Sequence, residues 1–230
     1  MLGKEPRLHV VYLNVLFKTH AFKSVLIFDQ ITHFIMQIAL LICRSLFFVF
    51  LVSAANTQAE TETYIADPEH TFVYWGVTHF GTSTVRGRFD RTSGEIRLDR
   101  QARTGTVQVE IDIASISSGI ELFDKKLRSE QFFDAETFPK ANFIGTQFKY
   151  SAEKLTEVVG ELTLRGKTNP LTLTAKNFNC YNSPLAKKEV CGGDFEASFS
   201  RGQFGINYGW PFVSDTVKLQ IQIEAFKESP

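Results

Sequence analysis

Apolar and polar residues alternate with a period of two along most of the chain after residue 59. The pattern is longest in residues 107–113 and 217–223, where Val, Ile or Leu occupies every second position and polar residues lie between. In an extended strand this spacing places all the apolar side chains on one face. Shorter segments of the same kind are separated by Gly, Asn, Asp and Pro, so the pattern predicts about eight strands in an all-β antiparallel fold.

A single segment departs from this alternation. Residues 119–133 place Leu122, Phe123 and Leu127 at helical spacing with charges between them, which predicts one short helix packed on the β-structure or across its mouth. The strands are short for a tilted membrane crossing and their turns are charged. These features favour an eight-stranded antiparallel barrel with an oily interior over an outer-membrane barrel.

The N-terminal part of the chain differs in composition from the rest. Residues 36–59 carry one positive charge, Arg44, then an apolar run, and then small or polar residues up to Ala59. This order is typical of a secretory signal peptide followed by a mature domain over 60–230, and it predicts a soluble periplasmic protein. Residues 1–35 fit no region of such a signal, so we interpret them as a mis-called start or an N-terminal extension.

The charge of the expected mature domain argues against nucleic acid as a partner. The chain has 25 basic and 25 acidic residues, of which five and two lie in the first 59, so the remainder carries a small negative net charge. No stretch of this remainder concentrates Lys or Arg. Binding to a phosphate backbone requires a basic stripe, so nucleic acid is not an expected partner.

Two cysteines, Cys180 and Cys191, lie in the expected mature domain. An even pair at short spacing in an exported protein is typical of a disulfide, and the turn-forming residues between them predict a hairpin. A redox site would favour C-x-x-C spacing, and a metal site would need further ligands where the domain offers only His70 and His79. A structural disulfide is therefore favoured, and no metal is expected.

The tract 67–90 contains a row of residues two apart, Val73, Trp75, Val77 and His79, in which a histidine closes an otherwise apolar face. His79 is expected to be a hydrogen-bonded wall residue or, alternatively, to position the polar end of a ligand. The sequence contains no G-x-S-x-G, H-E-x-x-H, P-loop or dinucleotide motif. A pair of His79 with Asp124 would lack an identifiable nucleophile, so no catalytic residue is assigned and an enzyme is not expected.

Several motifs over residues 64–227 match a known family in order and spacing. They are D-P-E-H-T at 67–71, V-R-G-R-F at 85–89, F-D-K-K-L-R-S at 123–129, F-P-K-A-N-F at 138–143, G-E-L-T-L-R-G-K-T at 160–168, R-G-Q-F-G at 201–205 and D-T-V at 215–217. The chain resembles the YceI-like family of exported lipid-binding proteins. The resemblance implies an eight-stranded antiparallel lipocalin-like barrel that holds a polyisoprenoid, or a similar long-chain amphiphile such as a quinone, prenyl lipid or fatty amide. It also implies a role in transport, storage or a stress response.

Two motifs depart from the family pattern near the expected mouth of the barrel. The helix of the family usually reads R-D-x-H-L, where this chain has Phe123 and Lys126 in place of Arg and His. The family motif R-S-D-F-G is R-G-Q-F-G here. The apolar lining is unaffected, so the ligand class implied by the resemblance is the same while head-group contacts differ.

The inner rows, one helix-flanking aromatic and one arginine supply the candidate ligand contacts. They are Val73, Trp75, Val77, His79, Val107, Val109, Ile111, Phe132, Phe143, Leu162, Leu171, Leu173, Arg201, Val217 and Leu219. Asp124 and Arg201 are expected first as capping or ion-pair groups and second as head-group contacts. Phe132 and Phe133 are expected as core under the helix, or alternatively as a gate.

Apolar alternation by itself favours a solid core over a pocket, and only the resemblance reverses this preference. The alternative function is therefore an exported protein-interaction module with a filled core and no ligand. Further expected partners are a membrane, in transient contact, and a second copy of the chain through the outward-facing Phe72 and Tyr74. Replacement of Val109 or Leu219 by Trp is expected to block a lipid tunnel while leaving the fold intact.

Overall fold

The computed structural model describes residues 36–40 and 60–228, which belong to two separate units. Residues 36–40 are helical, with exposed side chains. The rest of the expected signal peptide, the expected extension over 1–35 and the last two residues of the expected mature domain lie outside the described residues. In the described part of the chain, no helix is long and apolar enough to cross a bilayer.

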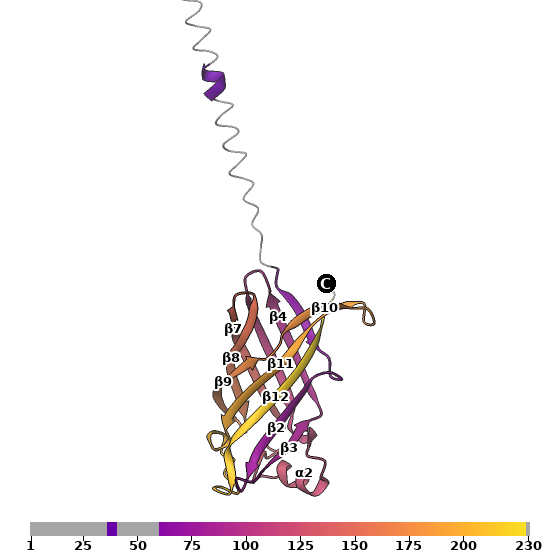
Figure 1. The fold of residues 1–230 in the computed structure, drawn as a ribbon, viewed down its shortest axis with the longest axis vertical. Helices are drawn as coiled ribbons and strands as arrows, with labels where there is room; N and C mark the ends of the chain where they lie inside the picture. Colours follow the sequence, from indigo (N-terminus) through magenta and orange to yellow (C-terminus); the bar gives the residue numbers. More distant parts are fainter. Residues whose placement is uncertain (1–35, 41–59, 229–230) are drawn as a thin grey trace, which may run out of the picture. The chain divides into compact units, whose positions relative to one another are not determined.

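Strands make up most of residues 60–228 (Figure 1). The elements are β1 (Glu62–Ala66), β2 (Phe72–His79), β3 (Ser83–Phe89), β4 (Thr92–Asp99), β5 (Thr104–Asp112), η1 (Ile113–Ser115), β6 (Ile116–Ser117), α2 (Glu121–Arg128), β7 (Lys140–Ser151), β8 (Lys154–Leu164), β9 (Lys167–Ala175), β10 (Asn179–Ser183), β11 (Lys188–Ser200), η2 (Arg201–Phe204) and β12 (Val213–Lys227).

Eight of these strands pair in a closed order that runs β1, β4, β5, β7, β8, β9, β11, β12 and back to β1. Each pairing is antiparallel, and the pairing of β11 with β12 completes the ring. The predicted all-β, eight-stranded antiparallel fold with a short helix is therefore confirmed. The structure differs from the prediction in four additional strands, β2, β3, β6 and β10, which extend the sheet to twelve strands.

The additional strands arise partly because β12 is long enough to pair with two strands in succession along one edge. It pairs with β2 over 213–222 and with β1 over 225–227. The chain turns between β1 and β2 at Pro68, which has no N–H to donate to a sheet. There the Asp67 carboxylate accepts from the Glu69 N–H at 3.0 Å and lies 2.6 Å from Nδ1 of His70. This local turn divides what would otherwise be one long strand alongside β12.

The predicted alternation separates the inner face of the ring from the outer face. Val107 and Leu219 are buried in the core, whereas Gln108, Lys218 and Gln220, which alternate with them along β5 and β12, are exposed. The inner residues of β2, β5, β7, β8, β9, β11 and β12 form one connected hydrophobic cluster. The assignment of each strand residue to inside or outside thus follows from the period of two.

Helix α2 is shorter than the predicted segment 119–133, and one of its predicted core positions is wrong. Leu127 is buried, but the side chain of Leu122 is 81% exposed. Residues five apart on a helix are separated by about 140° around its axis, so these two leucines cannot share a face. Phe123, four positions before Leu127, packs against the core instead.

The predicted disulfide is present. Cys180 and Cys191 are direct cross-strand partners in the β10–β11 hairpin, and their sulfur atoms are bonded. The carboxylate of Glu189 lies near both sulfur atoms, which resembles a set of metal ligands in residue type. A disulfide offers no thiolate for a metal, so the geometry supports a structural bridge.

Candidate functional site

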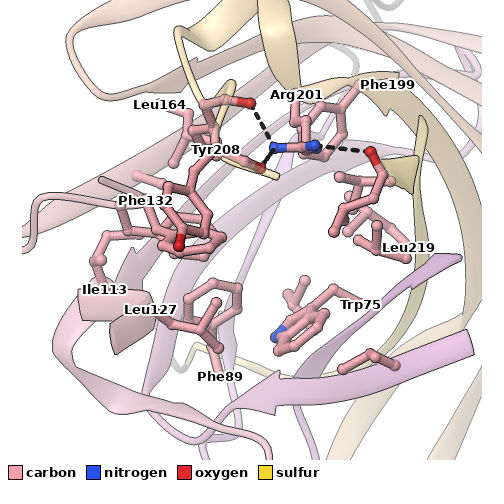
Figure 2. Close-up of a pocket in the computed structure, with 18 of the residues that line it drawn as sticks. Trp75, Phe89, Ile113, Leu127, Phe132, Leu164, Phe199, Arg201, Tyr208 and Leu219 are labelled. Atoms are coloured by element: carbon pink, nitrogen blue, oxygen red, sulfur yellow. Dashed lines mark hydrogen bonds between the residues drawn. The ribbon is translucent and has the colours of Figure 1, made fainter. Parts of the chain in front are cut away.

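A cavity of about 430 Å³ lies inside the end of the domain that carries α2 (Figure 2). Its wall is formed by the inner faces of β2 and β3, the first part of β12, α2 with the loop that follows it, and the segment after η2. Aliphatic and aromatic side chains provide most of the lining. Charged or polar side chains enter the wall at His79, Lys126, Arg201 and Tyr208.

Strand β2 provides one wall. Val73, Trp75, Val77 and His79 share one face of the strand, as their spacing predicts, and all four line the cavity. Trp75 pairs with Gly87 on β3, and a Cβ atom at Gly87 would lie only 2.4 Å from the indole ring. The missing side chain therefore allows the ring to lie across β3. The indole Nε1 of Trp75 is buried without a hydrogen-bond partner among the described residues.

Helix α2 and the loop after it close the opposite side. Phe123 and Leu127 line the cavity from α2, and Phe132 and Phe133 line it from the loop. The loop is held to the helix by the Phe133 N–H, which donates to the carbonyl of Leu127 at 3.0 Å. The Arg165 guanidinium donates to the Phe132 carbonyl at 2.7 Å and ties the loop to the end of β8. The backbone of both phenylalanines is thus tied to neighbouring elements, and their side chains line the cavity.

Arg201 is almost fully buried and organises the segment between η2 and β12. Its Nε donates to the carbonyl of Ser214, one terminal nitrogen donates to those of Ile206 and Tyr208, each at 2.8 Å, and the other donates to Val213 at 2.9 Å. Figure 2 shows the Arg201 guanidinium at the cavity wall with hydrogen bonds to other lining residues, among them Tyr208. Arg201 therefore has a structural role, with its charge beside the cavity, but within the described domain it acts through carbonyl hydrogen bonds and not through the expected ion pair.

Burial lowers the pKa of Arg201, and the nearby Asp215 carboxylate opposes this shift. Asp215 in turn accepts a hydrogen bond from the Ser200 hydroxyl and another from the Gly202 N–H at 2.8 Å. The hydrogen bond from Ser200 is the main reason that the pKa of Asp215 is lowered. The two charges hold opposite ends of one segment, 200–215, in place.

The lining residues that are also exposed mark where the cavity reaches the surface. They are His79, Ile120, Lys126 and Tyr208. The Lys126 ammonium donates to the Tyr208 hydroxyl at 3.1 Å and lies 4.2 Å from the centre of its ring. Tyr208 packs on Phe132 with ring centres 5.2 Å apart. Most of the polar groups of the site therefore gather at its mouth, and the deeper wall is apolar.

The inner rows border two mainly apolar cavities, and Trp75, Leu171 and Leu219 also border a more polar pocket of about 900 Å³ among residues of β2, β3, β9, β11 and β12. The predicted contacts that line the larger apolar cavity are Val73, Trp75, Val77, His79, Ile111, Phe132, Leu162, Arg201, Val217 and Leu219. A second cavity of about 60 Å³ lies among Val107, Val109 and Leu173, in the part of the ring that contains Tyr64 and Cys191. Phe143 and Leu171 are buried but line neither of these two apolar cavities. The interior is therefore close to filled in one part and hollow in another.

Sequence reasoning missed a group of lining residues that comes partly from strands and partly from the segments between them. They include Val85, Phe89, Ile113, Ile120, Phe199, Ile206, Tyr208 and Val213. The alternation in β3 was a usable signal for Val85 and Phe89. The segment 205–213 has no periodic pattern, so its inward residues depend on how the carbonyl bonds of Arg201 shape the backbone.

The site lacks the arrangement of an acid–base pair at the positions considered from the sequence. Asp124 accepts a hydrogen bond from the Ser118 N–H at 2.7 Å and so fixes the chain before α2. No ion pair joins it to His79 within residues 60–228. This agrees with the structural role expected first for Asp124.

A family model for the YceI-like domain matches residues 64–225, which include nearly all the strands. The chain belongs to the YceI-like family. This confirms the resemblance seen in the motifs of the sequence. A relative of this YceI-like chain, a UPF0312 protein of Pseudomonas putida (strain W619), is 31% identical over 179 residues, which cover 77% of this chain and 92% of the relative.

Two solved structures share the fold of this YceI-like chain. BcnA of Burkholderia cenocepacia has a TM-score of 0.59 at 22% identity and covers 70% of this chain and 99% of its own. A polyisoprenoid binding domain from Saccharophagus degradans, implicated in plant cell wall breakdown, has a TM-score of 0.54 at 14% identity, over 74% of this chain and 100% of its own. At these identities the two structures establish the fold alone.

Proposed function

We propose that this protein is a periplasmic, non-enzymatic binding protein that holds a polyisoprenoid or a similar long-chain amphiphilic lipid for transport, storage or a stress response. The observation that carries the proposal is the apolar cavity of about 430 Å³. The alternative interaction module requires a filled core, which this volume argues against. Membership of the YceI-like family and the likeness to a polyisoprenoid binding domain support the ligand class.

The size and lining of the cavity fit such a ligand. Ligand pockets commonly span about 300–1,000 Å³ and use a few polar groups to orient an otherwise apolar contact. Each ligand methylene that leaves water contributes about 0.8 kcal/mol, so a few prenyl units supply ample affinity. The polar groups Lys126 and Tyr208 lie at the mouth, and the deep wall is apolar. We therefore place the apolar chain inside and the polar end at the mouth.

The experiment is mass spectrometry of an organic extract from the exported protein, purified from the periplasm without detergent. The expected result is one prenyl lipid, quinone or fatty amide in a constant molar ratio to the protein. Recovery in the periplasmic fraction also tests the proposed location. An empty extract, together with no rise in unfolding temperature on adding isoprenoids, would transfer support to the interaction module.

A homodimer through Phe72 and Tyr74 stays a prediction. These residues lie on the outer face of β2 with ring centres 6.3 Å apart, and the Arg88 guanidinium covers the Phe72 ring at 4.7 Å. Sedimentation velocity of the wild type and of a Tyr74→Ser variant decides it. A concentration-dependent dimer that the substitution abolishes is the expected outcome.

A further inference from the structure

Large apolar side chains are exposed around the mouth of the cavity. Phe80 is 60% exposed, Ile120 62%, Trp210 68% and Phe212 58%. Leu122 and Tyr208 are also exposed and belong to the same segments, and we define the mouth patch as these six residues: Phe80, Ile120, Leu122, Tyr208, Trp210 and Phe212. Contiguous exposed apolar patches of this kind mark interaction sites, whereas single apolar side chains scattered over a surface are normal.

The patch surrounds the entrance because each of its three segments also contributes to the cavity wall. The β2–β3 turn brings Phe80 next to His79, and the start of α2 brings Leu122 next to Ile120 and Phe123. Trp210 and Phe212 lie between Tyr208 and Val213. An apolar molecule that leaves the cavity therefore passes directly over the patch.

The exposed rings are held in place by the fold. Phe80 and Phe212 stack with ring centres 5.0 Å apart, and the Phe80 N–H donates to the Phe212 carbonyl at 2.7 Å. The Trp210 N–H donates to the Asn207 carbonyl at 3.2 Å. Arg201 binds the carbonyl of Tyr208 from beneath. The backbone presents these side chains to solvent at a fixed position, so they lose little further freedom when they are covered.

We propose that the mouth patch docks onto the surface of a phospholipid bilayer, so that the lipid passes between membrane and cavity without crossing water. This inference rests on the proposed function for the identity of the cargo. Trp, Tyr and Phe with neighbouring Lys are the side chains that favour the membrane interface, where an amphipathic ring meets both acyl chains and head groups. Lys126 provides a cation against the Tyr208 ring, within reach of lipid phosphates at the entrance.

The bilayer fits this surface better than a protein partner because of what the patch encloses. A protein bound to the patch would cover the entrance to the cavity. A bilayer seated there would join its own apolar interior to an apolar cavity. Lys125 and Arg128, on the same helix as Lys126, add positive charge, against Glu121 and the buried Asp124. The helix therefore carries a small net positive charge near the entrance, as an anionic surface requires.

The test uses the full protein and vesicles of phosphatidylethanolamine and phosphatidylglycerol without isoprenoid. The wild type is expected to sediment with these vesicles, and a triple variant Phe80→Asn, Trp210→Ser, Phe212→Ser is expected to lose at least about tenfold in vesicle partitioning, since binding scales with the inserted apolar area. Asn suits position 80 because its backbone is left-handed there, with a φ of 49°. None of the three side chains lines the cavity.

The matched control is Leu185→Ser. Leu185 is 93% exposed, more than any patch residue, but it lies in the turn of the β10–β11 hairpin, at the end of the domain opposite α2 (Figure 1). Its substitution is expected to leave partitioning unchanged. The wild type is also expected to show quenching of Trp210 fluorescence by brominated phospholipids, which the single variant Trp210→Phe loses. This readout carries the test even where the triple variant does not fold.

Three results would overturn the inference. They are no partitioning of the wild type, equal partitioning of the folded triple variant, and self-association through the patch in sedimentation velocity without vesicle binding. Cargo binding is measured separately, with a fluorescent isoprenoid in solution without vesicles. A protein that retains isoprenoid but ignores vesicles contradicts the docking alone. A protein that binds vesicles but no isoprenoid contradicts the proposed function alone.

Discussion

Two charged residues determine the local structure beside the cavity. Arg201 binds four backbone carbonyls of the segment that leads into β12, and Asp215 binds the N–H of Gly202 and the hydroxyl of Ser200. A lysine at position 201 could not satisfy these carbonyls, because its ammonium is a single point charge without the planar fork of arginine. The shape of the mouth thus depends on hydrogen bonds that no periodic sequence pattern predicts.

Asp215 leads to a prediction about acid stability. The pKa of its carboxyl is lowered in the folded state, chiefly by the hydrogen bond from Ser200. The stability that it contributes is therefore present above its unfolded pKa of about 3.9 and is lost as the pH falls through the lower folded pKa. We expect Asp215→Asn to reduce the free energy of unfolding at neutral pH and to flatten its decline in acid.

The measurement is the urea midpoint of the wild type and the variant as a function of pH. The difference between the two curves is expected to shrink as the pH falls below the unfolded pKa. Parallel curves over the whole acid range would show that the ionisation of Asp215 makes no contribution to folding.

Strand β10, like the two-residue strand β6, pairs with only one other strand within residues 60–228. It stands at one end of the sheet order and pairs with β11. Tyr181, in its centre, is exposed. The bond between Cys180 and Cys191 therefore adds a covalent link where the sheet has little other support. β11 itself is anchored independently by its long pairing with β12.

Replacement of both cysteines by serine is expected to act on this hairpin. By the loop-entropy account, closing a loop of this length contributes about 3 kcal/mol, so the free energy of unfolding should fall by up to that amount. Hydrogen exchange is expected to rise in residues 179–183 and to stay low in β8 and β12. Rapid exchange throughout the ring would contradict this and show that the disulfide supports the whole fold.

For the whole molecule, the decisive feature is the uneven filling of the interior. Side chains nearly fill the part of the ring around Val109, where about 60 Å³ is left. The part that contains Leu219 borders the cavity of about 430 Å³. The sequence predicts that Trp at either position would block a tunnel, but in the structure the two positions line different cavities.

We therefore expect different effects from Leu219→Trp and Val109→Trp. The first places a ring in the larger cavity, and displacing two ligand methylenes would cost about 1.6 kcal/mol, or about tenfold in affinity. The second overfills a small space and is expected to cost about 1–3 kcal/mol of stability while isoprenoid retention is unchanged. Retention in solution and thermal unfolding of both variants decide the matter. Unchanged retention in folded Leu219→Trp would contradict the assignment of the larger cavity as the lipid site.

Much of the candidate site could be predicted because it lies on regular strands. The row from Val73 to His79 lines the cavity as its spacing indicates, and Val217 and Leu219 do so from β12. The failures lie where several segments meet. Leu122 is exposed because only one face of the short helix α2 packs on the core. In a helix of about two turns, the apolar spacing in the sequence was too short to show which face this would be.

The sequence by itself determined the strand class, the inner and outer faces, the disulfide pair and the family, because each depends on local spacing or on motifs in order. Only the tertiary structure decided where β1 ends and β2 begins along β12, which inner residues border empty space, and which apolar side chains surround its entrance. The physical reason is that a cavity is the space left between side chains from distant strands, so its volume depends on all of them together. Gly87, beneath Trp75, and Arg201, beneath Tyr208, shape this space through contacts between segments that are distant in the sequence.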